Sequence, residues 1–185
     1  MEEVRLYLLG TCMGVILQQR NTLCLHASGV VFDDQVILFT GESGVGKSTT
    51  LSYFYQKGYK VLGDDTLPIK WINNQPFIVP SAPDIKLWKN SIEALEFGDD
   101  SSFKSISPEF PDKFRIRIHN QFERELRPLK KCILLDWKES TNLSLEALSI
   151  AEAAHLFRRN TYRSCLLYTS PSPRDATLSR MPSSA

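Results

Sequence analysis

Apolar and polar residues change their spacing several times along the chain, and each spacing predicts a different element. Residues 4–17 are largely apolar, which predicts a core helix over residues 4–19. Residues 28–32 and 36–40 are short β-branched or apolar runs, and residues 33–35 between them have a tight-turn sequence, so a hairpin is expected. The second run is almost continuously apolar, which is typical of a strand buried on both faces of a sheet.

A glycine-rich segment follows this second strand directly. Residues 41–46 contain three glycines, and a helical stretch then runs to Gly58, which can end the helix as a left-handed cap. Residues 59–63 predict another strand, which leads into Asp64 and Asp65. Strand, loop, helix and strand in this order predict a βαβ unit within an α/β domain.

The remainder of the chain predicts shorter elements separated by turn residues. They are a hairpin of residues 67–72 and 76–79, a short helix at 88–97, a surface loop at 99–112, a half-exposed strand at 114–118, a buried strand at 132–136 and a helix at 149–160. Ser149 and Glu152 have the spacing of a capping box at the start of the last helix. No repeat or linker divides the chain, so we expect a single domain.

The composition changes abruptly near the end of the chain. Residues 165–185 are rich in Ser and Pro, which alone predicts a disordered tail. The segment also resembles a translated sequencing adaptor, with residues 165–175 matching a transposase-end adaptor and residues 179–185 matching a flow-cell primer. We therefore expect the natural sequence to be residues 1–164, truncated at its C-terminus, and we exclude the tail from the predicted fold.

Composition and charge narrow the class of protein. Hydrophobic residues make up 42% of the chain, and 22 basic against 21 acidic residues give a net charge of +1, which disfavours nucleic-acid binding through overall charge. The apolar run at 4–17 is too short to span a bilayer, and Cys12, Cys24 and Cys132 show no metal-ligand spacing. These features favour a cytoplasmic protein with reduced thiols that neither binds nucleic acid nor crosses a membrane.

The strongest chemical signal is a complete match to the phosphate-binding pattern G-x-x-x-x-G-K-[ST]. The matching residues are Gly41, Glu42, Ser43, Gly44, Val45, Gly46, Lys47 and Ser48, followed by Thr49. Glycines let backbone N–H groups close around phosphates, and the N-terminus of the following helix favours anions. We expect Lys47 to contact the β- and γ-phosphates and the Ser48 hydroxyl to coordinate Mg²⁺. The sequence therefore predicts a site for ATP and Mg²⁺ in this loop.

Two adjacent carboxylates, Asp64 and Asp65, follow the strand after the predicted P-loop helix. At the carboxyl end of a parallel strand, where ligands of open α/β sheets bind, one carboxylate can hold Mg²⁺ while the other accepts a proton from an attacking hydroxyl. The simpler interpretation is a solvated turn, since Asp is favoured in turns. His26 carries little weight by itself, and we interpret His119 and His155 as structural or exposed.

Residues 25–69, taken together, resemble the catalytic core of the HPr kinase/phosphorylase family and its HPr-kinase-like relatives. That family has a His before the hairpin, a P-loop of the form G-x-S-G-x-G-K-S and an Asp-Asp pair after the next strand. Here His26 lies 15 residues before the P-loop and Asp64 lies 17 residues after Lys47, spacings similar to the family's own. The fold implied for residues 1–164 is a P-loop kinase core of the HPr kinase and PEP carboxykinase-like type, with a mixed sheet and flanking helices.

The resemblance also implies roles for individual residues. Asp64 would be the catalytic base, His26 its polarising partner and Lys47 a catalytic phosphate ligand. Ser48 and Asp65 are the candidates for holding Mg²⁺. The implied function is an ATP-dependent serine kinase that transfers the γ-phosphoryl group to a hydroxyl on a protein or peptide, and the implied assembly is a homo-oligomer.

The acceptor stays open at this point. The chain has no match to the family's later signature segment that helps engage HPr, which disfavours HPr itself. Relatives of the family include kinases that act on other serines, among them those of precursor peptides. Lys113 is a candidate for a further phosphate contact, although an exposed lysine at a strand edge is the simpler interpretation.

Two other functions share a P-loop. An ABC-type ATPase also has a GESG-like P-loop, and residues 132–136 resemble a Walker B strand. However, Trp137 stands where a catalytic Glu would follow, and no LSGGQ-like segment lies between the two motifs. A non-catalytic nucleotide-binding module of a peptide-modification system would not need His26 and Asp64. The kinase is therefore the first hypothesis.

Overall fold

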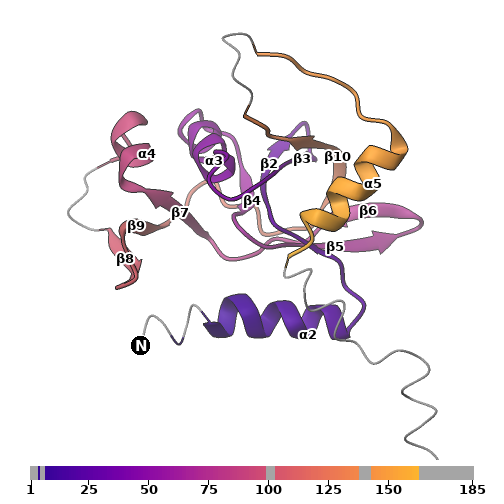
Figure 1. Ribbon diagram of the computed structural model, residues 1–185, viewed down its shortest axis with the longest axis horizontal. Helices are drawn as coiled ribbons and strands as arrows, with labels where there is room; N and C mark the ends of the chain where they lie inside the picture. Colours follow the sequence, from indigo (N-terminus) through magenta and orange to yellow (C-terminus); the bar gives the residue numbers. More distant parts are fainter. Residues whose placement is uncertain (1–3, 5–6, 99–102, 138–142, 163–185) are drawn as a thin grey trace, which may run out of the picture.

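The computed structural model describes residues 4, 7–98, 103–137 and 143–162. The adaptor-like tail predicted for residues 165–185 lies outside the described residues, as do parts of the predicted segments at 4–19 and 99–112. Within the described parts the chain forms a mixed α/β fold with two sheets, which confirms the predicted fold class at that level (Figure 1).

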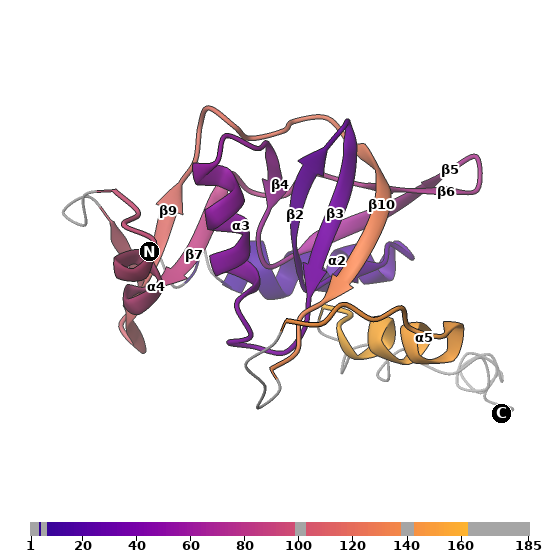
Figure 2. The same cartoon turned by 90° about the horizontal axis from the view of Figure 1, so that it is seen from above.

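The described elements are, in chain order, the π-helical turn η1 (Leu8–Cys12), α2 (Met13–Gln19), β1 (Cys24–Leu25), β2 (Ala27–Phe32), β3 (Gln35–Thr40), α3 (Lys47–Gln56), β4 (Val61–Gly63), β5 (Leu67–Ile72), β6 (Gln75–Ile78), β7 (Asp84–Trp88), α4 (Lys89–Ala94), β8 (Lys104–Ser107), β9 (Phe110–Arg117), β10 (Arg127–Leu134) and α5 (Ile150–Arg159). Among them, the larger sheet has the strand order β1-β5-β6-β10-β3-β2-β4 and the smaller sheet the order β7-β9-β8. Helix α3 packs against β2 and β3 of the larger sheet and against β7 of the smaller one (Figure 2).

The direction of the strands determines where the chain segments after them meet. Strand β2 pairs antiparallel with both β3 and β4, so β3 and β4 run parallel to each other with β2 between them. Strand β10 pairs parallel with β3 on its other side. The predicted βαβ unit is therefore confirmed, with one strand inserted into it. Because β3, β4 and β10 all point the same way, the segments that follow them gather at one edge of the sheet.

Both predicted hairpins are confirmed, and the backbone conformation of the turn residues accounts for each of them. Asp33 and Asp34 join β2 to β3 with φ of 47° and 59°, and Asn73 and Asn74 join β5 to β6 with φ of 49° and 61°. Two consecutive residues with positive φ form the type I′ turn, whose twist matches that of the strands it connects. Asp and Asn tolerate this left-handed conformation better than most residues, so these two turns could be predicted from local sequence.

The core consists of two buried clusters on opposite faces of the larger sheet, because neighbouring residues of β2 and β3 alternate between them. The cluster toward α3 and the smaller sheet includes Val30, Phe39, Leu51, Val61, Ile85 and Ile116. The cluster on the other face includes Val31, Leu38, Leu62, Leu67, Ile69 and Ile78. Strand β3 is thus buried on both faces, as its continuous apolar sequence predicts.

The prediction of a core helix at residues 4–19 is wrong in its burial. Helix α2 is present, but Gly14 is its one fully buried residue, and Met13 and Ile16 are 42% and 40% exposed. The contact with the fold is close at Gly14, where a Cβ would lie 2.8 Å from Cε1 of Tyr162. Apolar sequence predicts burial only where another element covers it, and the strands fill the core without this helix.

The surface loop predicted at 99–112 is also corrected. Residues Lys104–Ser107 and Phe110–Arg117 pair as β8 and β9, with a register shift between Ser105 and Ser107. Pro111 lies opposite that shift, where a strand tolerates proline. The sequence prediction also missed β7, although its residues Asp84–Trp88 alternate polar and apolar side chains, which is a strand pattern. The polar composition of residues 99–112 therefore led to the prediction of a loop where β8 and the start of β9 lie.

The start of α5 and the end of α3 agree with the sequence prediction. The side chain of Ser149 accepts a hydrogen bond from the backbone of Glu152, and the Glu152 carboxylate accepts one from the backbone of Ser149, so the predicted capping box of α5 is confirmed. Gly58 follows α3 with φ of 88°, as expected of a left-handed cap. None of the helices in the described parts of the chain is long and apolar enough to cross a bilayer.

A buried carboxylate ties the segment between β9 and β10 to the larger sheet. The Glu123 side chain is 6% exposed and accepts hydrogen bonds from Nζ of Lys60 (3.3 Å) and Nη2 of Arg127 (3.0 Å). The backbone N–H groups of Arg124 and Glu125 donate to its other oxygen. Burial alone would raise the pKa of Glu123, but these hydrogen bonds outweigh it and lower the pKa below its usual value.

We expect Glu123→Ala to lower the free energy of unfolding by about 2 kcal/mol, because it leaves two cations and two backbone donors without their acceptor. For a domain of this size the corresponding fall in melting temperature is about 4–8 °C. Glu125→Ala is the matched control, because the Glu125 side chain is 79% exposed. This variant should change the free energy of unfolding by no more than about 0.5 kcal/mol. Thermal and urea unfolding measure both variants, and equal destabilisation would contradict the prediction.

Candidate active site

The segment predicted to be a P-loop, residues 41–48 (the P-loop segment), runs from the end of β3 into the first turn of α3 in a conformation that requires glycine. Gly41 has φ of 143°, and a Cβ there would lie 2.5 Å from the backbone oxygen of Leu135, so no side chain fits. Gly46 has φ of 105° and directly precedes α3. A Cβ at Gly44 or Gly46 would meet no atom within 4 Å, which means that the space beside the loop is open. An open, glycine-lined loop before a helix N-terminus fits a phosphate group.

Lys47 lies inside this loop. Its side chain is buried, and its Nζ donates hydrogen bonds to the backbone oxygens of Gly41 and Glu42, both at 2.8 Å. Burial lowers the pKa of Lys47, whereas the negative charges of Asp64 and Asp65 oppose that effect. The loop thus holds an ammonium group at its centre, next to the carboxylates that follow β4.

Asp64 is the buried carboxylate of the pair. Its Oδ1 accepts hydrogen bonds from Oγ of Ser28 at 2.7 Å and from Oγ of Ser48 at 3.0 Å, and its Oδ2 accepts one from the backbone N–H of Lys86 at 3.1 Å. Burial raises the pKa of Asp64, while the hydrogen bonds from Ser28, Lys86 and Ser48 act against that effect. The P-loop helix and the end of β4 therefore meet through the contact between Ser48 and Asp64.

Asp65 lies beside it with different partners. Its Oδ1 is 3.1 Å from Nε2 of His26, and its Oδ2 accepts a hydrogen bond from Nζ of Lys86 at 2.6 Å. Burial would raise the pKa of Asp65, but the hydrogen bond from His26 and the positive charge of Lys86 outweigh it and hold the pKa well below its usual range. The two adjacent carboxylates thus have opposite electrostatic environments.

The resemblance implies that His26 is the polarising partner of Asp64, and the contacts in the structure are arranged differently. His26 contacts Asp65 and not Asp64, and Ser48 contacts Asp64 and not Asp65. The physical reason is the backbone of Asp65, whose φ of 78° turns its side chain away from that of its neighbour. The structure nevertheless brings His26, Ser48 and both aspartates together at the edge of the sheet where β3 and β4 end.

Two residues of the site were missed in the sequence. Ser28 in β2 lies beside β4 in the sheet, and a single serine in an apolar strand carries no signal of this contact. Lys86 in β7 could have been noticed, because it is a basic residue within an alternating strand pattern. Lys113, in β9, lies opposite Trp88 with its Nζ 5.4 Å from that ring, and its charge contributes to lowering the pKa of Lys47.

The remaining residues of the predicted nucleotide site differ in position. Glu42 and Ser43 are exposed on the loop, and Val45 is half-buried. Thr49 Oγ1 lies 3.1 Å from Oγ of Ser91 in α4, so this hydroxyl is engaged by the fold and contacts neither carboxylate. Thr49 therefore supports the position of α3.

The donors available for a divalent cation are few. Among the described residues no group of three or more His, Cys, Asp or Glu side chains is arranged to hold a metal ion. Mg²⁺ is commonly bound by one or two carboxylates together with phosphate oxygens and water, and does not need such a cage. The Ser48 hydroxyl and the carboxylates of Asp64 and Asp65 supply oxygen ligands of the kind that fits Mg²⁺.

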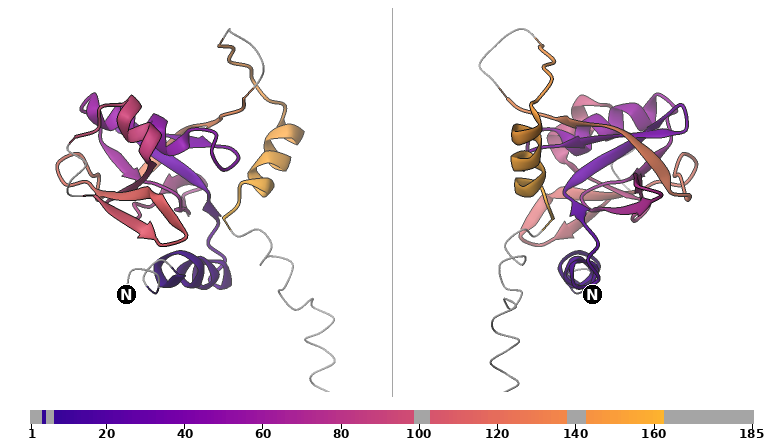
Figure 3. Two further views of the ribbon diagram at one scale, coloured as in Figure 1. Left: turned by 60° about the vertical axis from the view of Figure 1, so that its left-hand side comes forward. Right: turned by 90° about the vertical axis from the view of Figure 1, so that its right-hand side faces the viewer.

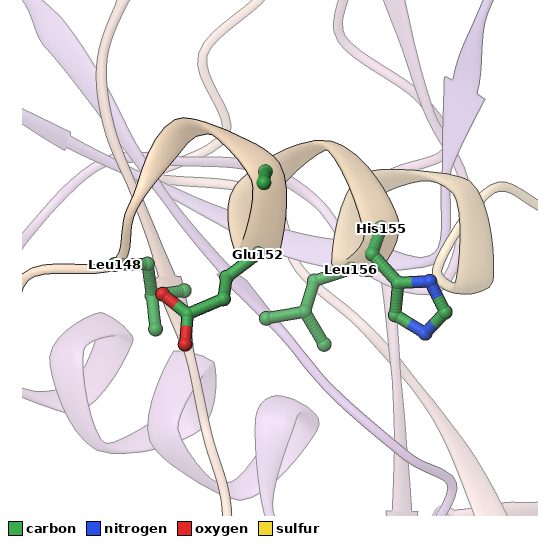
Figure 4. A pocket seen from close by; sticks show the side chains of 5 residues that line it. Leu148, Glu152, His155 and Leu156 are labelled. Carbon is green, nitrogen blue, oxygen red and sulfur yellow. The ribbon is translucent and has the colours of Figure 1, made fainter.

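Other candidates from the sequence lie outside this cluster. His119 and His155 are exposed, as expected. Asp136, which would end a Walker B strand in an ABC-type ATPase, is exposed after β10, and Asp64 is the carboxylate that contacts Ser48. A hollow along one face of α5 is lined by Leu148, Ala151, Glu152, His155 and Leu156, none of which belongs to the predicted site (Figure 4).

Comparison with known proteins gives the following findings. The chain is 32% identical over 87 residues to an HPr kinase/phosphorylase of Clostridium beijerinckii, a match that covers 47% of this chain and 28% of the relative. The chain therefore spans less than a third of the length of that relative. A solved structure described as the Hpr(Ser) kinase/phosphatase from Coxiella burnetii is 20% identical, with a TM-score of 0.41, over 65% of this chain and 69% of that one. No protein-family model matches. The sequence match supports the resemblance to HPr kinase/phosphorylase drawn from residues 25–69.

Proposed function

We propose that this HPr kinase-like chain is an ATP-dependent kinase that transfers the γ-phosphoryl group of ATP to a serine hydroxyl on a protein or peptide. The observation that carries the proposal is the convergence of Lys47, Ser48 and Asp64, since a buried ammonium, a hydroxyl and a buried carboxylate meet beside an open glycine-lined loop. The sequence match to an HPr kinase/phosphorylase supports the same class of reaction.

The proposed transfer uses Asp64 as the proton acceptor. A bond forms between the acceptor oxygen and the γ-phosphorus, and the bond from that phosphorus to the β,γ-bridging oxygen breaks, with its electron pair leaving on ADP. The hydroxyl proton passes to the carboxylate of Asp64. Lys47 offsets the negative charge of the β- and γ-phosphates, which is the largest requirement of phosphoryl transfer.

The two aspartates would have different roles, with Asp64 accepting the proton and Asp65 binding Mg²⁺. Asp65 is held ionised by His26 and Lys86, which suits a ligand of a hard cation, and the Ser48 hydroxyl would be the second protein ligand of Mg²⁺. Bound Mg²⁺ would neutralise charge on the phosphates. Because Ser48 contacts Asp64 in the structure, the reverse division of roles is the alternative, and it predicts that Asp64→Asn and not Asp65→Asn raises the Mg²⁺ requirement.

Transfer from γ-labelled ATP tests the proposal directly. The acceptors are the serine-containing proteins and peptides encoded next to the gene of this chain, each paired with a variant in which the serines are replaced by alanine. We expect label on one acceptor, lost in its alanine variant, and phosphoserine in its mass spectrum. Binding of ATP without transfer to any neighbouring acceptor would favour a nucleotide-binding module, and absence of ATP binding would contradict both functions.

A further inference from the structure

The last residue of α5 reaches the P-loop segment from far along the chain. Nη2 of Arg159 donates a hydrogen bond to Oε1 of Glu42 at 2.7 Å, across a sequence separation of 117 residues. Glu42 is the second residue of the phosphate-binding pattern, and its backbone oxygen accepts a hydrogen bond from Nζ of Lys47. One loop residue therefore joins two cations, Lys47 from inside the loop and Arg159 from outside it.

The residues after α5 are hydrogen-bonded to the chain around His26, so the position of Arg159 does not depend only on its contact with Glu42. The backbone N–H of His26 donates to the oxygen of Asn160, and the N–H of Tyr162 donates to the oxygen of Cys24, both at 2.8 Å. Thr161 pairs with Leu25 in an isolated β-bridge. Figure 3 shows α5 on the outside of the fold, with its C-terminal end returning to the sheet.

Side chains reinforce this attachment next to the candidate catalytic residues. Thr161 and Tyr162 are buried, and the Tyr162 ring lies edge-on to the ring of His26 with 6.3 Å between centroids. Nε2 of Gln18 donates to the oxygen of Tyr162 at 2.7 Å. The same short segment therefore positions His26 on one side and Arg159 on the other.

The contact between Arg159 and Glu42 is easily exchanged for another. The Arg159 side chain is 59% exposed and the Glu42 side chain is 81% exposed. An exposed ion pair of this kind contributes little to stability because water competes for both charges. A guanidinium forms stronger, often bidentate, hydrogen bonds with a phosphate group. A phosphate bound in the loop would thus compete effectively with Glu42 for Arg159.

We propose that Arg159 is a phosphate-binding residue supplied by α5 of the same chain, which leaves Glu42 and contacts the terminal phosphate of the bound nucleoside triphosphate. This inference rests on the proposed function, because it requires ATP in the P-loop. Arg159 would then add a second positive charge to that of Lys47 at the bound phosphates. Glu42 holds the guanidinium beside the loop until a phosphate takes its place.

The test compares the affinities of the full chain for ATP and for ADP, each with Mg²⁺, by calorimetry. We expect Arg159→Ala to weaken ATP binding roughly tenfold or more while ADP binding changes by less than about twofold, because ADP lacks the phosphate that Arg159 contacts. Arg159→Lys should recover part of the difference, since it restores the charge without the planar fork. Glu42→Gln should strengthen ATP binding about twofold by removing the competing carboxylate.

Arg158→Ala is the matched control, because it removes an arginine from the adjacent position of the same helix, and it should change neither affinity. Melting temperatures of all variants show that the fold is intact. If Arg159→Ala leaves the ratio of ATP to ADP affinity as in the wild type, the role of Arg159 is wrong while the proposed function stands. If the wild type binds neither nucleotide, the proposed function itself fails.

Discussion

Asp64→Asn is expected to reduce phosphoryl transfer by roughly 10²–10⁴-fold and to leave ATP binding close to that of the wild type. Asparagine keeps the size of the side chain, and its one amide oxygen can still accept the hydrogen bonds from Ser28 and Ser48, while the backbone N–H of Lys86 loses its acceptor. The amide has no lone pair basic enough to take the proton of an attacking hydroxyl. The rate therefore falls, while the phosphate contacts made by the loop remain.

Asp65→Asn is the matched control at the adjacent position. If Asp65 is the cation ligand, its neutral amide raises the Mg²⁺ concentration needed for half-maximal transfer, which Asp64→Asn does not. His26→Ala should give an intermediate loss of rate, because His26 contacts Asp65 and fixes its carboxylate. Single-turnover transfer from labelled ATP, measured over a series of Mg²⁺ concentrations, compares the three variants.

Two results would overturn the assignment of the carboxylates. Undiminished transfer by Asp64→Asn would remove Asp64 as the proton acceptor. A shifted Mg²⁺ requirement in Asp64→Asn, with an unshifted one in Asp65→Asn, would exchange the two roles, as the contact between Ser48 and Asp64 allows.

Lys47→Ala is expected to weaken ATP binding by at least about 100-fold. The Lys47 ammonium can make two charge-assisted hydrogen bonds to phosphate oxygens, each worth about 1.5–3 kcal/mol, and every 1.4 kcal/mol corresponds to about tenfold in affinity. In the structure the same group donates to the backbone oxygens of Gly41 and Glu42, so phosphate would replace carbonyl partners that the loop already offers. The fold should persist, since the helix that follows stays anchored by Leu51 in the core.

Lys57→Ala is the control for this variant, because Lys57 follows the other end of α3 and its Nζ lies 5.5 Å from the Tyr53 ring, away from the loop. It should leave ATP affinity unchanged. Calorimetry with ATP and Mg²⁺ measures both variants, and thermal melts confirm that each is folded. Equal ATP affinity in the wild type and Lys47→Ala would remove the P-loop as the nucleotide site.

Features that depend on a few consecutive residues could be predicted from the sequence. The turns at Asp33-Asp34 and Asn73-Asn74 and the capping box of Ser149 and Glu152 are examples, because neighbouring residues alone decide their backbone conformation. The glycine spacing of the P-loop segment and its place between a strand and a helix belong to the same class. The exposure of α2 could not be predicted in this way, because it depends on whether another element covers the helix. The strands β8 and β9 could not be predicted either, because they depend on pairing within the smaller sheet.

The sequence by itself singled out the lysine, the hydroxyl and the two carboxylates of the candidate site, since these follow from motif and spacing, whereas Ser28 and Lys86 do not. Only the tertiary structure decided their partners. Ser28 joins Asp64 across 36 residues and Arg159 joins Glu42 across 117, and such contacts arise where the strands and α5 meet at one edge of the sheet. Adjacent aspartates look alike in sequence, but the positive φ of Asp65 directs it to His26 and Lys86, while burial and two serines surround Asp64. Their chemical difference therefore comes from packing, which sets the charge and the solvent around each carboxylate.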